Sequence, residues 1–326
     1  MTAIGRRIGG GILWLLLSAC AQAQLETVWQ RGEMGYEVSA LALLPDGSGM
    51  VSVSGIREVG VLRLWQLPEG NYFHTLSTFQ LLPHQHALSS NGEFLLTFTH
   101  YGNRFNIWQL ATRSIAYEVP APLLGQGTAY LVSAFLTPDG QRIIASLYGC
   151  ERSGDYGEGC YEYVYAIACL QIPDGGIVWE RVSTDYELDL LAMSPDGQWL
   201  VISGDKVQVL NAQTGELRYE LPFTATSAAF SPDNQQFALG NWSGTLTLHR
   251  VADGAVIRTF GAAHQDRVKS VAFSPDGTRL VSVGMDGFVR VWNLTDGALI
   301  RSLRAHSRSV STALFYGNES LLTAGA

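Results

Sequence analysis

The residue types that could bind a metal come closest together at two histidines separated by one residue. His84 and His86 would lie on the same face of a strand, because alternate residues of a strand share a face. Two imidazoles on one face are a partial ligand set for a metal such as zinc, and His74 and His100 lie nearby in the sequence. The same histidines also suit ordinary polar positions of a strand, so we expect no metal site. A metal-dependent activity through His84 and His86 is the alternative.

Sequence patterns that support other kinds of catalysis are absent. The sequence contains no Gly-x-Ser-x-Gly nucleophile elbow, no glycine-rich phosphate loop and no Cys-x-x-Cys metal pair. The carboxylates on its turns form no pair whose spacing suggests acid–base catalysis. We therefore expect a protein without enzymatic activity, without catalytic residues and without a cofactor.

The composition limits the class of protein and its partners. The 326 residues are 47% apolar and 15% charged, which is typical of a folded globular protein. The formal net charge is -8. An acidic surface repels phosphate backbones, and no cluster of Lys and Arg offsets it. Nucleic acid is therefore not an expected partner.

The N-terminal segment, residues 1–23, has the features of an export signal. Arg6 and Arg7 precede an apolar run that is too short to span a bilayer but suits a secretion signal. The sequence Leu-Ser-Ala-Cys ending at Cys20 is similar to a bacterial lipobox, which would make Cys20 the lipidated first residue. The sequence Ala-Gln-Ala ending at Ala23 would instead release a soluble periplasmic protein, and an uncleaved anchor is a third interpretation. We expect an exported protein that meets the membrane only through a lipid anchor.

The remaining cysteines are interpreted in an oxidising compartment. Cys150 and Cys160 bracket a short loop, and export permits a disulfide between them. Closing so short a loop would stabilise the fold by about 2–3 kcal/mol. Cys169 lies within an apolar run, where we expect a small buried residue and not a nucleophile.

A four-residue turn recurs along the chain. Its usual sequence is Ser-Pro-Asp-Gly, in which Pro presets φ and the final Gly or Asn tolerates the left-handed conformation that lets a hairpin close. The turns lie at 44–47, 89–92, 137–140, 194–197, 231–234, 274–277 and 315–318. Their last residues are 45, 48, 57, 37, 43 and 41 residues apart, which indicates an array of similar units.

Each unit has the pattern of four antiparallel strands. The turn at 274–277 lies between the alternating segments SVAFS and RLVSV, which predict two strands. A second turn, LTDG after Trp292, ends a third strand, and ALIRSL predicts a fourth. One such sheet cannot bury both of its faces, whereas a ring of them can.

The segment 263–297 resembles a repeat of the WD-repeat family of β-propellers. The family's repeat begins with Gly-His and ends with Trp-Asp, and this segment has Ala-His at 263–264 and Trp-Asn at 292–293. The resemblance implies a structural hydrogen-bond tetrad, formed here by His264, Ser282, Asp286 and Trp292. The other units are degenerate: Trp65 and Trp108 hold the Trp position in the first two units, whereas the next three have Leu170, Leu210 and His249.

Seven turns predict an all-β, seven-bladed β-propeller over residues 25–326. Residues 25–33 align with the outer strand of a blade, so the N-terminal part of the propeller should close the last blade. The Asp that would pair with His306 falls at position 328, past Ala326, so we expect the last blade to lack its third strand. The chain would then be truncated, and its propeller could be the recognition domain of a longer protein. A naturally incomplete last blade is the alternative.

The resemblance places partner binding on the propeller face that carries the loops between second and third strands. Aligning the fifth unit with the sixth at an offset of 43 residues puts Trp242 opposite Met285 and Ser243 opposite Asp286. Trp242 should therefore project from that face as an anchor, with Met285 as a second partner-binding candidate. Packing of Trp242 against a neighbouring blade is the alternative.

Insertions add further candidates to the same face. The longest insertion, which contains the loop between Cys150 and Cys160, carries Tyr156 among acidic residues and favours a basic or amphipathic peptide. The other candidates are Arg57, in a smaller insertion, and Tyr101, at the position of the turn Asp. For Tyr156, Arg57 and Tyr101 alike, the alternative is sequence variation that the loops tolerate without a function. We expect a monomeric, non-enzymatic scaffold that binds an envelope protein or peptide. A small-ligand sensor or an enzyme that uses the central channel is the rival.

Overall fold

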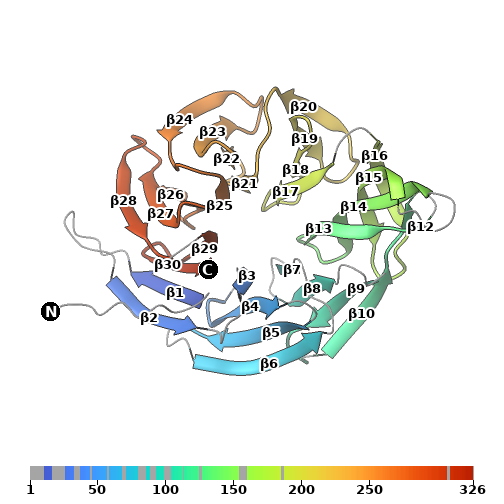
Figure 1. Cartoon of the computed structure of the whole chain (residues 1–326), viewed down its shortest axis with the longest axis horizontal. Helices are drawn as coiled ribbons and strands as arrows, with labels where there is room; N and C mark the ends of the chain where they lie inside the picture. Colours follow the sequence, from blue (N-terminus) through green and yellow to red (C-terminus); the bar gives the residue numbers. More distant parts are fainter. Residues whose placement is uncertain are drawn as a thin grey trace.

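The computed structural model describes residues 11–16, 26–32, 37–44, 46–56, 59–67, 71–79, 86–88, 93–98, 104–112, 114–124, 127–153, 160–184, 187–306 and 309–325. All regular elements within these ranges are β-strands. Seven four-stranded antiparallel sheets, with one two-stranded sheet, contain all of these strands. The seven larger sheets form a ring of blades (Figure 1). The predicted all-β propeller of four-stranded blades is confirmed.

Each blade is an antiparallel meander. Blades one and two comprise β3 (Glu37–Leu43), β4 (Gly49–Ile56), β5 (Val59–Gln66), β6 (Asn71–Phe79), β7 (His86–Leu88), β8 (Phe94–Phe98), β9 (Arg104–Gln109) and β10 (Ser114–Pro120). After the small sheet of β11 (Leu123–Leu124) and β12 (Gly127–Thr128), blades three and four comprise β13 (Tyr130–Leu136), β14 (Arg142–Ser153), β15 (Cys160–Gln171), β16 (Ile177–Ser183), β17 (Asp189–Met193), β18 (Trp199–Ser203), β19 (Val207–Asn211) and β20 (Leu217–Leu221). Blades five and six comprise β21 (Ser227–Phe230), β22 (Gln236–Gly240), β23 (Thr245–Arg250), β24 (Val256–Ala262), β25 (Val268–Phe273), β26 (Arg279–Gly284), β27 (Phe288–Asn293) and β28 (Leu299–Arg304).

Blade seven differs from the expectation of an incomplete sheet. Its strands are β29 (Val310–Tyr316), β30 (Ser320–Gly325), β1 (Gly11–Leu16) and β2 (Glu26–Gly32), so it has four. β1 pairs with β30 on one side and with β2 on the other, antiparallel in both cases. The third position, expected to be empty, is therefore filled by residues from the apolar run that also has the features of an export signal. A strand edge left between β30 and β2 would expose unpaired backbone groups, and β1 satisfies them.

The recurrent Ser-Pro-Asp-Gly turn is held by its own side chains. In blade six the Ser274 hydroxyl donates to Asp276 Oδ1 at 2.6 Å and accepts from the Arg279 amide at 2.9 Å. Gly277 has φ of 68°, a left-handed conformation that explains why Gly ends the turn. The same arrangement recurs at Ser194 and Ser231. The sequence repeat is thus a repeat of one self-bonded turn.

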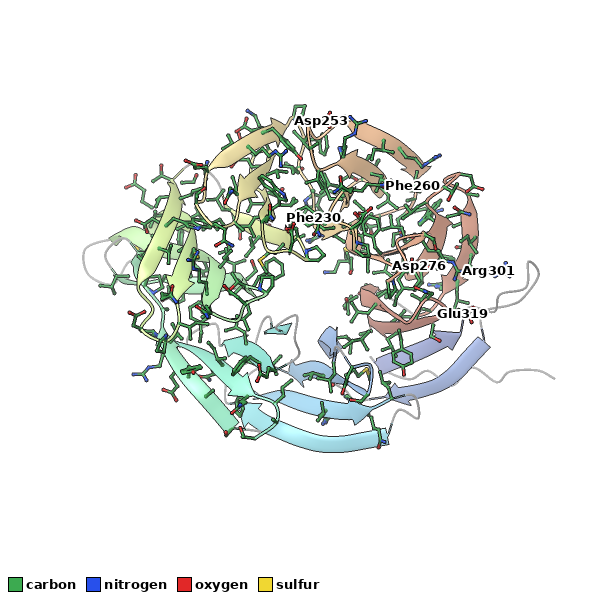
Figure 2. The ribbon with its side chains drawn as sticks, turned by 180° about the vertical axis from the view of Figure 1, so that it is seen from behind. Phe230, Asp253, Phe260, Asp276, Arg301 and Glu319 are labelled. Atoms are coloured by element: carbon green, nitrogen blue, oxygen red, sulfur yellow. The ribbon has the colours of Figure 1, made fainter. Side chains whose placement is uncertain are left out.

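The core consists of apolar layers between neighbouring blades. Figure 2 shows Phe230 and Phe260 among packed side chains, whereas Asp253 and Arg301 lie at the outer edge of the ring. Phe230 belongs to the layer between blades four and five, and Phe260 to the layer between blades five and six. Because each blade contacts mainly its neighbours, the inter-blade layers decide where side chains from adjacent blades can meet.

Candidate functional site

Blade six brings its four tetrad residues into one chain of hydrogen bonds. Trp292 Nε1 donates to Ser282 Oγ at 3.0 Å, and His264 Nε2 lies 2.9 Å from the same hydroxyl. His264 Nδ1 lies 2.9 Å from Asp286 Oδ1, so the chain runs from the outer part of the blade to its loop face. Arg290 adds a bond to Asp286 Oδ2 at 3.0 Å.

Electrostatics fix the protonation state of this chain. Burial lowers the pKa of His264 and outweighs the hydrogen bond and charge of Asp286, while the positive charge of Arg290 lowers it further. Burial alone would raise the pKa of Asp286, but the hydrogen bonds from His264 and Arg290 hold it below its ordinary value. Because an ionised carboxylate only accepts, we assign the Nδ1 proton of His264 to the bond with Asp286, which leaves Nε2 to accept from Ser282. Arg290 Nη1 also lies 2.7 Å from Nδ1, and in this tautomer it donates to Asp286. Every polar group is used internally, which makes the tetrad a structural device.

Other blades keep parts of this chain. Trp65 donates to Ser52 Oγ at 2.7 Å in blade one, and Trp108 donates to Thr97 Oγ1 at 2.9 Å in blade two. In blade seven, His306 Nε2 lies 3.0 Å from the Thr323 hydroxyl. No carboxylate among the described residues forms an ion pair with His306, and burial lowers the pKa of His306 to about 4.

The loop face over blades five and six carries an exposed aromatic–cation pair. Trp242 is 61% exposed, and the Arg267 guanidinium carbon lies 4.1 Å from the centroid of its ring. Met285, 46% exposed, donates its amide to the Arg267 carbonyl at 3.0 Å. Trp242, Arg267 and Met285 form what we call the Trp242 patch. The structure thus brings together two of the predicted partner-binding residues and adds Arg267.

Arg267 forms no ion pair with a carboxylate of the described residues. Its buried Nε has no hydrogen-bond partner in the structure. Arg267 lies within electrostatic reach of Asp189: burial raises the pKa of Asp189, and the charge of Arg267 opposes the rise. The patch therefore presents an arginine that can still bind an anionic group.

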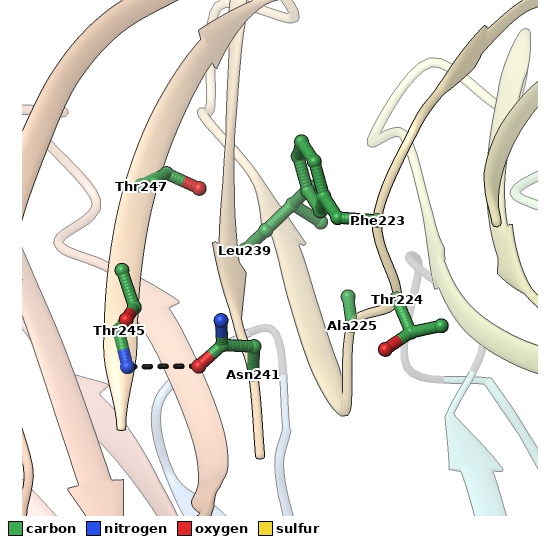
Figure 3. Close-up of a pocket in the computed structure, with 7 residues that line it drawn as sticks. All are labelled: Phe223, Thr224, Ala225, Leu239, Asn241, Thr245 and Thr247. Atoms are coloured by element: carbon green, nitrogen blue, oxygen red, sulfur yellow. Dashed lines mark hydrogen bonds between the residues drawn. The ribbon is translucent and has the colours of Figure 1, made fainter. Parts of the chain in front are cut away.

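A small cavity lies beside this patch, on the side of blade five that faces blade four (Figure 3). Its volume is about 190 Å³. Six of the residues that line it are Phe223, Ala225, Leu239, Asn241, Thr245 and Thr247. Asn241 directly precedes Trp242, and its carbonyl accepts from the amide of Val268, the residue after Arg267, at 3.0 Å. The cavity and the Trp242 patch are therefore adjacent.

The remaining predicted residues are only partly described. Arg57, Tyr101, Tyr156, His84 and Cys20 lie outside the described residues, and the side chains of His86 and Cys160 are likewise not described. Cys150 is disulfide-bonded. Cys169 is a free, buried thiol, and burial raises its pKa to about 11, which suits the predicted structural role.

The described residues contain neither a metal-binding cluster nor a membrane-spanning helix. No group of three or more His, Cys, Asp or Glu residues there is arranged to hold a metal ion. No helix in the same part of the chain has the length and apolarity needed to cross a membrane.

One segment of the chain matches a known protein family. Residues 254–293 match the family described as WD domain, G-beta repeat. This match covers the tetrad of blade six and supports a WD-repeat family assignment for the propeller. A search of curated proteins gives no match to the chain.

Proposed function

We propose, from a WD-repeat propeller with an exposed Trp242 patch, that this protein is a non-enzymatic scaffold that binds a partner protein or peptide on its loop face. WD40 repeats are generally protein-interaction scaffolds. The observation that carries the proposal is the Trp242 patch: an exposed indole stacked with an arginine that forms no ion pair with a described carboxylate. Tryptophan and arginine are the residue types most often found as binding anchors.

The patch also indicates the partner's chemistry. Arg267 favours a partner segment with a carboxylate, which could form a bidentate pair with the guanidinium. The predicted acidic rim around Tyr156 in blade three favours a basic segment elsewhere on the same partner. We propose an amphipathic peptide that places an acidic residue at blade six, with any basic residues directed toward blade three.

The proposed location is the bacterial cell envelope. The basic and apolar N-terminal segment supports export, and the Leu-Ser-Ala-Cys sequence supports a lipid anchor at Cys20. Cleavage before Cys20 would remove β1, so blade seven of the anchored protein would consist of β29, β30 and β2. A lipid-anchored monomer would meet the membrane only through its acyl chains and would leave the loop face free for a partner. The mass of the mature N-terminal peptide tests the anchor directly.

Partner capture tests the proposed function. Cross-linked pull-downs from envelope fractions should compare the wild type with Trp242→Ala and with Tyr117→Ala as a matched control. Tyr117 is an exposed aromatic on β10, the outer strand of blade two. We expect a discrete partner that is retained by Tyr117→Ala and reduced about tenfold or more by Trp242→Ala. Equal capture by all three proteins would contradict docking on this patch.

A further inference from the structure

We propose that the cavity of blade five is a socket for one uncharged side chain of the partner peptide, positioned next to the acidic residue that Arg267 binds. This inference rests on the proposed function and specifies what the loop face recognises. Blades five and six are built alike: β23 begins at Thr245 and β27 at Phe288, and the strands of the two blades correspond at a constant offset. The two blades differ in the side chains that they place at corresponding positions.

The cavity of blade five lies where blade six has polar side chains of its tetrad network. In blade six, His264 and Arg290 lie over Ser282 and bond to Asp286. At the positions of Ser282 and Arg290, blade five has Leu239 and Thr247, which pair with each other across β22 and β23. Thr247 is shorter than Arg290 and Leu239 is apolar, and both line an unfilled volume of about 190 Å³.

The deeper wall of the cavity is apolar. Figure 3 shows Phe223 and Leu239 facing each other, with Ala225 nearby. No charged side chain lines the cavity. A charged group placed there would lose its hydration without gaining an ionic partner, so the lining selects an uncharged occupant.

One polar group of the lining has unused donors. The Asn241 Oδ1 atom accepts from the amides of Ser243 at 3.1 Å and Thr245 at 2.8 Å, which fixes the orientation of the side-chain amide. The amide nitrogen then points into the cavity (Figure 3), and no described residue accepts a hydrogen bond from it. Asn241 follows the end of β22 at the loop face, where the main chain of a docked peptide would pass. A carbonyl of that main chain is the acceptor that Asn241 lacks.

The size of the cavity restricts the occupant to a single side chain. A volume of about 190 Å³ lies below the range of about 300–1,000 Å³ that is typical of sites for drug-sized ligands. It is close to the apolar cavity of about 150 Å³ that accommodates a benzene ring in another protein. Leu, Met or Phe would fit the apolar wall, with the neighbouring backbone carbonyl at Asn241.

The socket and Arg267 together define a short recognition sequence. The hydrogen bond from Val268 to the Asn241 carbonyl places the two sites side by side, and Trp242 lies between them in contact with Arg267. A peptide with an apolar side chain in the socket would pass over Trp242 before its carboxylate reaches Arg267. The expected ligand is thus an apolar residue followed within a few positions by Asp or Glu.

The first test uses small probes on the wild-type protein. N-acetyl-L-leucinamide carries one apolar side chain and peptide-like carbonyls, and N-acetyl-L-lysinamide is its charged counterpart. NMR titration should show saturable shifts of the Asn241 side-chain amide and the Thr247 methyl group with the leucine probe, at an affinity about tenfold or more above that of the lysine probe. No saturable shift, or equal affinity for both probes, would overturn the socket.

The second test fills the socket by mutation. Leu239→Phe should occupy the cavity and weaken the leucine probe about tenfold, whereas Leu239→Met conserves volume and should bind the probe as the wild type does. If Leu239→Phe folds and binds the probe with wild-type affinity, the socket is wrong. If Leu239→Phe does not fold, the wild-type titration still decides the inference.

Partner capture separates the failure of this inference from the failure of the proposed function. Loss of the captured partner in both Leu239→Phe and Trp242→Ala supports the socket. Loss in Trp242→Ala alone overturns the socket and leaves docking on the face intact. Saturable probe binding without any Trp242-dependent partner would contradict the scaffold function while the cavity still bound an uncharged side chain.

Discussion

The strands of blades five and six correspond at an offset of 43 residues, but the two blades use their loop-side interior differently. In blade six, His264 and Asp286 join Ser282 and Trp292 in a buried chain of hydrogen bonds. In blade five the corresponding space is the cavity beside Leu239 and Thr247. The polar side chains of blade six bond to one another, whereas blade five leaves a cavity that a ligand can fill.

Blade five compensates with a different buried histidine. His249 stands where blade six has Trp292, and its Nδ1 lies 3.0 Å from the Gly254 carbonyl. Nδ1 must therefore donate, so Nε2 accepts from the Thr247 hydroxyl at 2.8 Å. Burial lowers the pKa of His249, so the ring stays neutral. The substitution keeps a histidine satisfied without the carboxylate, and Thr247, which bonds to this histidine, also lines the cavity.

The largest expected effect comes from breaking the blade-six network. Asp286→Ala removes the acceptor of both His264 and Arg290, so a buried histidine donor and a nearby cation lose their partner. We expect the free energy of unfolding to fall by about 3 kcal/mol. Urea unfolding followed by tryptophan fluorescence measures the change.

Ser243→Ala is the matched control in blade five. Ser243 holds the position of Asp286, but it is exposed and bonds only within its own turn. Its removal should lower the free energy of unfolding by about 1 kcal/mol or less. Equal losses in the two variants would show that the tetrad of blade six contributes no more than an ordinary turn.

Low pH should destabilise blade seven, where His306 and Thr323 form a partial version of the tetrad. Burial lowers the pKa of His306 from 6.5 to about 4. Between these two pH values the unfolded chain binds a proton at His306 that the folded chain excludes. The contribution of neutral His306 to the free energy of unfolding is therefore fully present above about pH 6.5 and is lost as the pH falls toward 4. The loss reaches about 3 kcal/mol.

His306→Gln isolates this contribution. Glutamine can still donate to Thr323 but does not titrate, so the variant should lose less stability than the wild type between pH 6.5 and 4. His249 and His264 also have lowered pKa values, so the stability of the variant should still fall with falling pH, but less steeply than that of the wild type. Superimposable pH profiles of the variant and the wild type would exclude His306 as a source of acid sensitivity.

Thr247→Val probes the substitute arrangement of blade five. The variant removes the hydroxyl that donates to the buried Nε2 of His249 and replaces it with a methyl group of similar size. We expect the free energy of unfolding to fall by about 2 kcal/mol, because a buried acceptor is left unsatisfied. Thr245→Val, whose hydroxyl lies 3.3 Å from the exposed Ser243, should cost about 0.5 kcal/mol. Similar costs from the two variants would mean that the bond to His249 contributes little.

The fold could be predicted from the sequence because its turns repeat. The Ser-Pro-Asp-Gly turn bonds to itself, so the same residues recur wherever the turn does, and the strands follow from the spacing. The third strand of blade seven could not be predicted in this way. The segment 11–16 carries no repeat signature, and an apolar run that suits an export signal also suits a buried strand.

The candidate site could be predicted only in part. The alignment at constant offset brought Trp242 opposite Met285, and both are exposed on the same face. Arg267 was missed because its role depends on stacking with Trp242 across two blades, which no local pattern encodes. The cavity left a signal, since Leu239 stands at the position of Ser282 and Thr247 at that of Arg290. An empty volume, however, depends on how all the surrounding side chains pack.

The smallest effect concerns the turn at which the two blades differ by one residue. Asn234 ends the blade-five turn with φ of 59°, where blade six has Gly277 with φ of 68°. Asn234→Gly should change the free energy of unfolding by about 0.5 kcal/mol or less, because glycine adopts this conformation freely and only the exposed bond from the Asp196 amide is lost. Asn234→Ala should cost about 1 kcal/mol or more, because its Cβ disfavours the left-handed region. If the alanine and glycine variants had the same thermal stability, the left-handed backbone conformation would not explain why Asn or Gly ends this turn. The geometry that the two blades share would then have to come from their strands alone.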